Sequence, residues 1–103
     1  MKGMGNIQKM MKQAQEMQAN LQRELAEMQI EGSSGGGMVT VTLDGSKALL
    51  SLKIDPEVVD PAELDMLQDL VMAAFNDAAA KVDDEVSQKM GAMGAGLKIP
   101  GLF

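Results

Sequence analysis

MVTVTLDGSKALLSLKI, residues 38–54, has a regular alternation of apolar and polar residues around one turn signal. Apolar and polar residues alternate on both sides of Asp44-Gly45, a pair typical of tight hairpin turns. A period of two places every second side chain on the same face of a strand. Residues 38–43 and 47–54 are therefore predicted to form a hairpin with one buried face.

A third strand is expected directly before this hairpin, because two strands alone are marginally stable in water. The candidate is the segment around residues 29–31, which would pair with the hairpin across a glycine-rich loop. That loop, GSSGGG at residues 32–37, is rich in residues that favour turns over regular structure.

Before the sheet, residues 6–28 are predicted to form a helix, since their apolar residues recur at helical spacing. The stripe is narrow and follows a seven-residue repeat, as in coiled coils. A helix of this length spans about 33 Å, which is more than the rest of so small a chain covers. A second copy of the chain is therefore expected to cover part of it, with Met10, Met17 and Leu21 in the dimer interface.

After the sheet, a second helix is predicted to begin at Asp60-Pro61-Ala62-Glu63 and to end at Gly91 and Gly94. Asp60 has the residue type of an N-cap, proline suits the first helical position and Glu63 completes a capping-box pattern. The apolar stripe of this helix contributes three further residues to the predicted dimer interface: Leu67, Val71 and Phe75.

The expected order is helix, three strands and helix, which is an α+β domain. Residues 1–90 are predicted to form this single domain, which would serve both dimerisation and binding. Residues 91–103 are predicted to form a flexible tail that contains glycine and proline.

The residue types needed for most chemistry are missing. The chain has no cysteine and no histidine, so it lacks thiol nucleophiles and the commonest general base and metal ligand. The glycine loop has the spacing of a phosphate-binding loop, but Met38 and Val39 stand where that motif needs Lys and Ser/Thr. The sequence therefore predicts no enzyme, no metal, no cofactor and no small-molecule substrate. With no signal-like segment and no membrane-length apolar run, a cytoplasmic protein is expected.

Charge is distributed unevenly along the chain. The formal net charge is −6, yet the first fifteen residues carry three lysines, Lys2, Lys9 and Lys12, and no acid. Lys9 and Lys12 lie three residues apart, on one helical face that avoids the apolar stripe, and Gln13 lies near that face. Lysine and amide side chains suit phosphate oxygens, which are bound without reading base sequence. A helix face that is only solvated has the same composition. Without further information, the residue types favour a solvated face over a phosphate-binding one.

Several stretches resemble the YbaB/EbfC family, and they occur in order over nearly the whole chain. They are residues 11–18 (MKQAQEMQ), residues 30–39 (IEGSSGGGMV), residues 53–56 (KIDP), residues 70–79 with AAFNDA at the centre, and the end, GLKIPGLF. Each piece alone carries little information, whereas the ordered combination is highly specific.

The resemblance implies a homodimer of α-β-β-β-α protomers, each with a three-stranded antiparallel sheet and two long helices that project like the arms of tweezers. It also implies DNA binding that alters DNA conformation, with roles in nucleoid organisation and gene regulation. The family's DNA contacts are attributed to its terminal helices, where Lys9, Lys12, Gln13 and Lys89 match in type. With Lys2 added for its charge, these are the expected DNA-binding residues.

One different class of function fits the same residues. An acidic, methionine-rich coiled-coil adaptor or chaperone would bind proteins through the same apolar stripe, since methionine packs well at adaptable interfaces. In that interpretation the lysines serve solubility alone.

Overall fold

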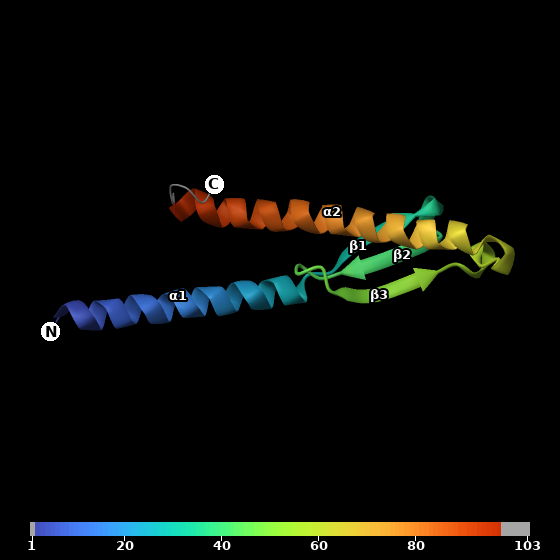
Figure 1. Ribbon diagram of the computed structural model, residues 1–103. Helices are drawn as coiled ribbons and strands as arrows, with labels where there is room; N and C mark the ends of the chain where they lie inside the picture. Colours follow the sequence, from blue (N-terminus) through green and yellow to red (C-terminus); the bar gives the residue numbers. More distant parts are fainter. Residues whose placement is uncertain (1, 98–103) are drawn as a thin grey trace.

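The computed structural model describes the backbone of residues 2–97 and the side chains of residues 5–91. Two helices and three strands follow one another as α1 (Lys2–Glu27), β1 (Ile30–Ser34), β2 (Val39–Leu43), β3 (Leu49–Ile54) and α2 (Leu64–Leu97). The strands form one antiparallel sheet in the order β1-β2-β3 (Figure 1). The predicted α+β fold of helix, three antiparallel strands and helix is confirmed.

The core lies between α2 and the two strands β1 and β2. Strand β2 buries Val39, Val41 and Leu43, the alternate residues that the hairpin pattern selected. Helix α2 packs against these residues with one face, on which Ala74, Ala78 and Val82 lie four residues apart and are all buried. Alanine at two of these positions lets the helix backbone come close to the sheet.

The glycine-rich segment differs from its prediction, because its first half is strand. Gly32, Ser33 and Ser34 belong to β1 and pair with Val41, Thr40 and Val39, and only Gly35–Gly37 form the turn. The reason is contact with α2. A Cβ on Gly32 would lie 2.7 Å from the Ala74 carbonyl oxygen and would overlap the backbone of Ala78, so only glycine allows this strand to lie against the helix.

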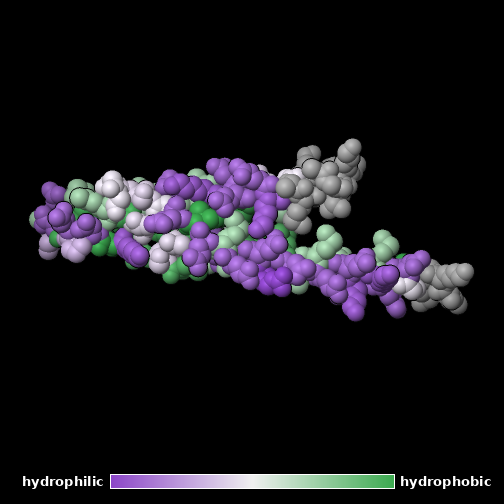
Figure 2. Space-filling model, turned by 180° about the vertical axis from the view of Figure 1, so that it is seen from behind, coloured by the Kyte–Doolittle hydropathy of each residue, from purple (hydrophilic) through white to green (hydrophobic). Residues whose placement is uncertain are grey.

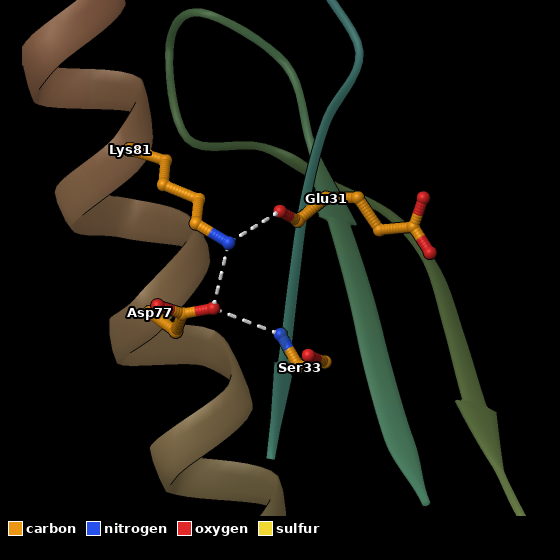
Figure 3. Close-up of polar contacts among 4 residues, drawn as sticks. All are labelled: Glu31, Ser33, Asp77 and Lys81. Atoms are coloured by element: carbon orange, nitrogen blue, oxygen red, sulfur yellow. Dashed lines mark hydrogen bonds and ion pairs between the residues drawn. The ribbon is translucent and has the colours of Figure 1, made fainter. Parts of the chain in front are cut away.

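The outer edge of β1 is closed by polar side chains of α2 (Figure 3). The Ser33 N–H donates to Asp77 Oδ2 over 3.0 Å, and Lys81 Nζ lies 3.0 Å from the same oxygen. Lys81 Nζ also donates to the Glu31 carbonyl at 3.5 Å. Because an open strand edge invites pairing with another chain, these contacts protect β1.

Strand β3 is exposed where the hairpin pattern predicted a buried face. Leu50 is 48% exposed and Leu52 is 42% exposed, although Leu52 pairs with the buried Val41 and so lies on the same face of the sheet. One helix of about 10 Å diameter covers roughly two strands spaced about 4.8 Å apart, and α2 lies over β1 and β2. The helix-facing side of β3 is therefore left open except at Ile54, which pairs with the buried Val39 and packs against the core.

Helix α2 also differs from its prediction at both ends. Pro61–Glu63 form a 3-10 turn that leads into the helix, and Asp60 caps that turn by accepting a hydrogen bond from the Ala62 N–H at 2.9 Å. At the other end the helix continues through Gly91 to Leu97. Gly91, Gly94 and Gly96 lie in this last part of the helix, and each costs about 1 kcal/mol relative to alanine, which weakens the helix there without ending it. Residues 98–103 of the predicted tail lie outside the described residues.

The molecule is elongated, with principal extents of 74 × 21 × 16 Å. The N-terminal end of α1 and the C-terminal end of α2 both extend beyond the same end of the sheet, so the two helices run in opposite chain directions (Figure 1). The 26 residues of α1 span about 39 Å. Residues 5–20 are all exposed, so most of α1 projects as an arm, defined here as residues 2–20.

Candidate nucleic-acid interface

The arm is amphipathic, and its polar side carries lysines. Lys9 and Lys12 are exposed on neighbouring turns, and Gln13 is exposed one turn after Lys9. The first turn of α1 contains no acidic residue, so nothing there offsets the partial positive charge of the helix N-terminus. Lys2 lies in this first turn, and its side chain is outside the described residues.

Lys9 and Lys12 of the arm differ from Lys47, Lys81 and Lys89 of the body in having no acidic partner within residues 5–91. Within residues 5–91, salt bridges join Lys47 to Asp83 at 2.8 Å and Lys81 to Asp77 at 3.0 Å. Neither Lys9 nor Lys12 forms a salt bridge in this part of the chain. The ammonium groups of Lys9 and Lys12 are therefore available to an external anion.

Lys89 is placed differently from the other predicted DNA-binding residues. It lies on α2 beside the base of α1, where its Nζ is 3.7 Å from Glu24 Oε2. The Lys89 side chain is about half exposed. A phosphate group would have to compete with Glu24 for this lysine, while Lys9 and Lys12 have no such competitor among the described residues.

Arg23 is a cation of α1 that the sequence analysis did not select. It is exposed and forms no salt bridge within residues 5–91. It follows Lys12 by eleven residues, close to three full turns, so both lie on the same face of the helix. The eleven-residue spacing from Lys12 could have identified Arg23 from the sequence. Arg23 lies outside the lysine-rich first fifteen residues, however, and close to Glu24 and Glu27.

The predicted dimer residues fall into two separate regions. Met10 and Met17 are exposed on the arm, on which hydrophobic groups project toward the side of α2 (Figure 2), while Leu21 is half-buried near its base. Leu67 and Val71 are partly buried against the core at the start of α2, and Phe75 is 37% exposed there. The six residues thus do not form one continuous patch within the protomer.

Asp77 and Lys81 lie on the flank of α2 that faces the outer edge of β1, because both side chains form hydrogen bonds with β1. Met72 and Phe75 lie on the opposite flank, toward β3, and both are exposed. We call these two residues, together with Leu50 and Leu52 of β3, the α2–β3 surface. The sequence pattern did not select Met72, Leu50 or Leu52 for an interface, because it predicted the face of β3 to be buried within the protomer.

The described part of the chain contains neither a metal-binding cluster nor a membrane-spanning helix. No group of three or more acidic side chains is arranged there to hold a metal ion. No helix of that part is long and apolar enough to cross a membrane.

Comparisons with known proteins agree with this arrangement. Residues 4–97 match the model of the YbaB/EbfC DNA-binding family. A nucleoid-associated protein of Rhodospirillum rubrum is 51% identical over 100 residues, which cover 94% of each chain. A nucleoid-associated protein of a Geobacillus strain is 56% identical over 104 residues, covering 98% of this chain and 96% of the relative.

The fold also has a counterpart among solved structures. The crystal structure of an uncharacterized protein of Helicobacter pylori superposes with a TM-score of 0.71 at 23% identity. The match covers 84% of this chain and 91% of the other, and it concerns the fold alone. Since the family model spans almost the whole chain and the relatives share about half of its residues, the chain belongs to the YbaB/EbfC DNA-binding family.

Proposed function

We propose that this chain is a non-enzymatic, nucleoid-associated protein that binds duplex DNA as a homodimer through the arms formed by α1. The observation that carries the proposal is the pair Lys9 and Lys12, exposed and without acidic partners in residues 5–91, on an arm that projects from the body. Lys2 and Gln13 extend this phosphate-binding face, and Lys89 and Arg23 stand nearer its base.

The net charge of −6 does not prevent such binding, because the arm separates its lysines from most of the acids. Charges more than about 10 Å apart in solvent are largely screened at moderate salt. Lys9 lies about 27 Å along the helix axis from the end of α1 at Glu27, at 1.5 Å for each residue. Phosphates at the arm are therefore attracted by the nearby lysines more than they are repelled by the body.

The homodimer is proposed to form through the α2–β3 surface. Its four exposed apolar side chains, from one flank of a helix and the open half of a sheet face, are of the kind that a partner chain buries. A two-fold axis would let the α2 of each protomer cover the β3 of the other with the same residues. Met10, Met17 and Leu21 on α1 remain predicted contacts beyond this surface.

Two arms on one dimeric frame also account for a change in DNA conformation. Arms held at a fixed spacing bind best to DNA whose phosphates match that spacing, so contact energy is available to bend or constrain the duplex. A protein of this kind would organise DNA in the bacterial nucleoid and affect transcription without reading a base sequence closely.

The test is the double variant Lys9→Glu/Lys12→Glu, measured by fluorescence anisotropy with a labelled duplex. The control is Lys53→Glu, compared with the single variant Lys9→Glu: both have the same net charge, and Lys53 lies in the body and forms no salt bridge within residues 5–91. The double variant is expected to lose binding, with unchanged circular dichroism and sedimentation. Lys53→Glu is expected to keep most of the affinity and to bind more tightly than Lys9→Glu.

Equal losses in Lys9→Glu and Lys53→Glu would mean that net charge alone governs binding, and the arm would have no special role. Unchanged affinity in the double variant would contradict the proposal and favour a protein-binding adaptor.

A further inference from the structure

The turn between β2 and β3 lies against the base of α1. The Gly45 N–H donates a hydrogen bond to the Leu25 carbonyl oxygen over 2.8 Å. The Leu25 carbonyl also accepts a hydrogen bond from the Met28 N–H at 3.3 Å, directly after the helix, so the turn adds a second donor to one of the last carbonyl groups of α1. The turn that closes the hairpin therefore also caps the helix that carries the lysines.

The contact between the turn and the helix leaves no spare room. A Cβ on Gly45 would lie 2.9 Å from Leu25 Cα and 2.8 Å from Met28 Sδ. A methionine sulfur can move aside by a change of rotamer, whereas Leu25 Cα is backbone and moves only with the helix. Position 45 therefore requires glycine, because the backbone of α1 lies too close for a side chain.

The turn itself is held rigidly. Asp44 is only 7% exposed, and its Oδ1 accepts hydrogen bonds from the Ser46 N–H at 2.8 Å, the Ser46 hydroxyl at 2.7 Å and the Ala48 N–H at 2.9 Å. Lys47, which has a φ of 66°, forms a salt bridge with Asp83 of α2. The turn is therefore fixed to the body as well as to α1.

A second contact at the same level joins the two helices directly. Lys89 Nζ of α2 lies 3.7 Å from Glu24 Oε2 of α1. Apart from the half-buried Leu21 and Leu25, the side chains of α1 from residue 5 onward are exposed, and the half-buried Met28 follows directly after the helix. The direction of the arm thus depends on a few contacts at its base.

We propose that Gly45 and Glu24 are positioning residues that set the angle at which the arm leaves the sheet, and with it the register of the lysines on DNA. The effect is amplified by length: a tilt of roughly 10° at the base of a helix of about 39 Å moves its tip by about 7 Å. That displacement equals about two steps of 3.4 Å along a DNA strand. The consequence for DNA rests on the proposed function, whereas the arm angle can be measured without DNA.

The experiment measures arm angle and DNA affinity in the same variants of the full chain. Because the chain has no cysteine, Gln18→Cys on α1 and Ser87→Cys on α2 provide two unique sites for spin labels. Both side chains are exposed. Labelled protein is mixed with an excess of cysteine-free chain, so that pulsed electron resonance reports the distance within one protomer.

Gly45→Ala is expected to shift the distance between the labels and to weaken duplex binding by roughly tenfold, as when one or two phosphate contacts no longer form. The matched control is Gly91→Ala, the same change at a position where an added Cβ meets nothing within 4 Å. Neither the distance nor the affinity is expected to change in the control.

Glu24→Gln provides a variant without added bulk, in case Gly45→Ala disturbs folding. Its control is Glu27→Gln, which removes the same charge from the same helix, where Glu27 has no salt bridge within residues 5–91. Glu24→Gln is expected to broaden the distance distribution relative to Glu27→Gln, as expected when an exposed ion pair between the two helices is lost. Because it also releases Lys89 for phosphate, the effect of the arm angle on DNA affinity is measured in Gly45→Ala.

An unchanged distance in both Gly45→Ala and Glu24→Gln would overturn the positioning role. A changed distance with parental DNA affinity would overturn the link between arm angle and DNA register. If the parent chain does not bind duplex DNA, the proposed function fails, while the label distances still decide whether Gly45 and Glu24 set the angle.

Discussion

Gly32 shows how a single residue determines the packing of this fold. It stands in the middle of β1, opposite Val41, where the sheet comes closest to the backbone of α2. Any side chain here would enter space occupied by Ala74 and Ala78. The absence of a side chain is what permits helix and sheet to share a tightly packed core.

Gly32→Ala is therefore expected to lower the free energy of unfolding by about 3 kcal/mol, the upper range for overpacking, because backbone atoms would have to move. Gly91→Ala is the control and should leave the free energy of unfolding within about 1 kcal/mol of the parent or raise it, since alanine favours helix. Urea denaturation at one protein concentration measures both. Equal stability of Gly32→Ala and the parent would refute the close contact.

The sequence did not predict this role, since Gly32 begins a run of glycine and serine that is typical of loops. The residues that require glycine there, Ala74 and Ala78, lie more than forty positions later in the chain. Gly45 was recognised only as part of a turn for the same reason. Local patterns identify the conformations that a glycine allows, while close approach depends on tertiary structure.

At the scale of elements, short sequence patterns correctly predicted the strands and helices that depend on local interactions. The alternation around Asp44-Gly45 identified β2 and β3, and the helical spacing of apolar residues identified α1 and α2. The burial of β3 was predicted wrongly, because alternation shows which side chains share a face and not what covers that face. Lysines on the polar side of α1 were predicted, but the pairing of Lys89 with Glu24 joins two helices and has no sequence signature.

Two carboxylates connect the elements, and both have lowered pKa values. The Ser46 hydroxyl and the Ala48 N–H lower the pKa of Asp44 in the hairpin turn. The Ser33 N–H and then Lys81 lower the pKa of Asp77 at the edge of β1. The unfolded chain, with ordinary pKa values near 3.9, binds protons first as pH falls. These contributions to stability are present above about pH 4 and are lost as pH falls through the lowered folded-state pKa values.

Replacing one of these carboxylates should reduce the sensitivity to acid. We expect Asp77→Asn to be less stable than the parent near pH 6 and to lose less stability between about pH 6 and about pH 3, as measured by urea denaturation at fixed protein concentration. Asp84→Asn is the control, since Asp84 makes no hydrogen bond or salt bridge within residues 5–91. The same pH dependence in Asp77→Asn and the parent would contradict the assignment.

At the scale of the whole molecule, the protomer has an arm that contacts little and a sheet that is half covered. Both features are explained if the chain is one half of an assembly. The α2–β3 surface would provide the contact between protomers, and the arms would remain outside it and reach DNA. In the proposed dimer, the exposed leucines of β3 would form the contact between protomers and the exposed lysines of α1 would bind DNA.

Leu52→Asp should break this assembly without unfolding the protomer, because Leu52 is already 42% exposed there. A buried, unpaired carboxylate at a dimer contact is expected to weaken dimerisation by at least about 30-fold, corresponding to about 2 kcal/mol or more. Val59→Asp is the control, because Val59 is an apolar residue that is 50% exposed and lies outside the α2–β3 surface. Analytical ultracentrifugation measures both variants. A Leu52→Asp dimer as strong as that of the parent would place the interface elsewhere.

The most direct test of the central claim is the salt dependence of duplex binding, compared between the parent and Lys9→Glu/Lys12→Glu. A homodimer presents two copies of Lys2, Lys9 and Lys12, and each lysine bound to a phosphate contributes about −0.9 to the slope of log affinity against log salt. With four to six lysines engaged, the account predicts a slope of roughly −4 to −5 for the parent. It also predicts little measurable binding for the variant. A parental slope near zero, or an equal slope in both proteins, would contradict DNA binding by the arms.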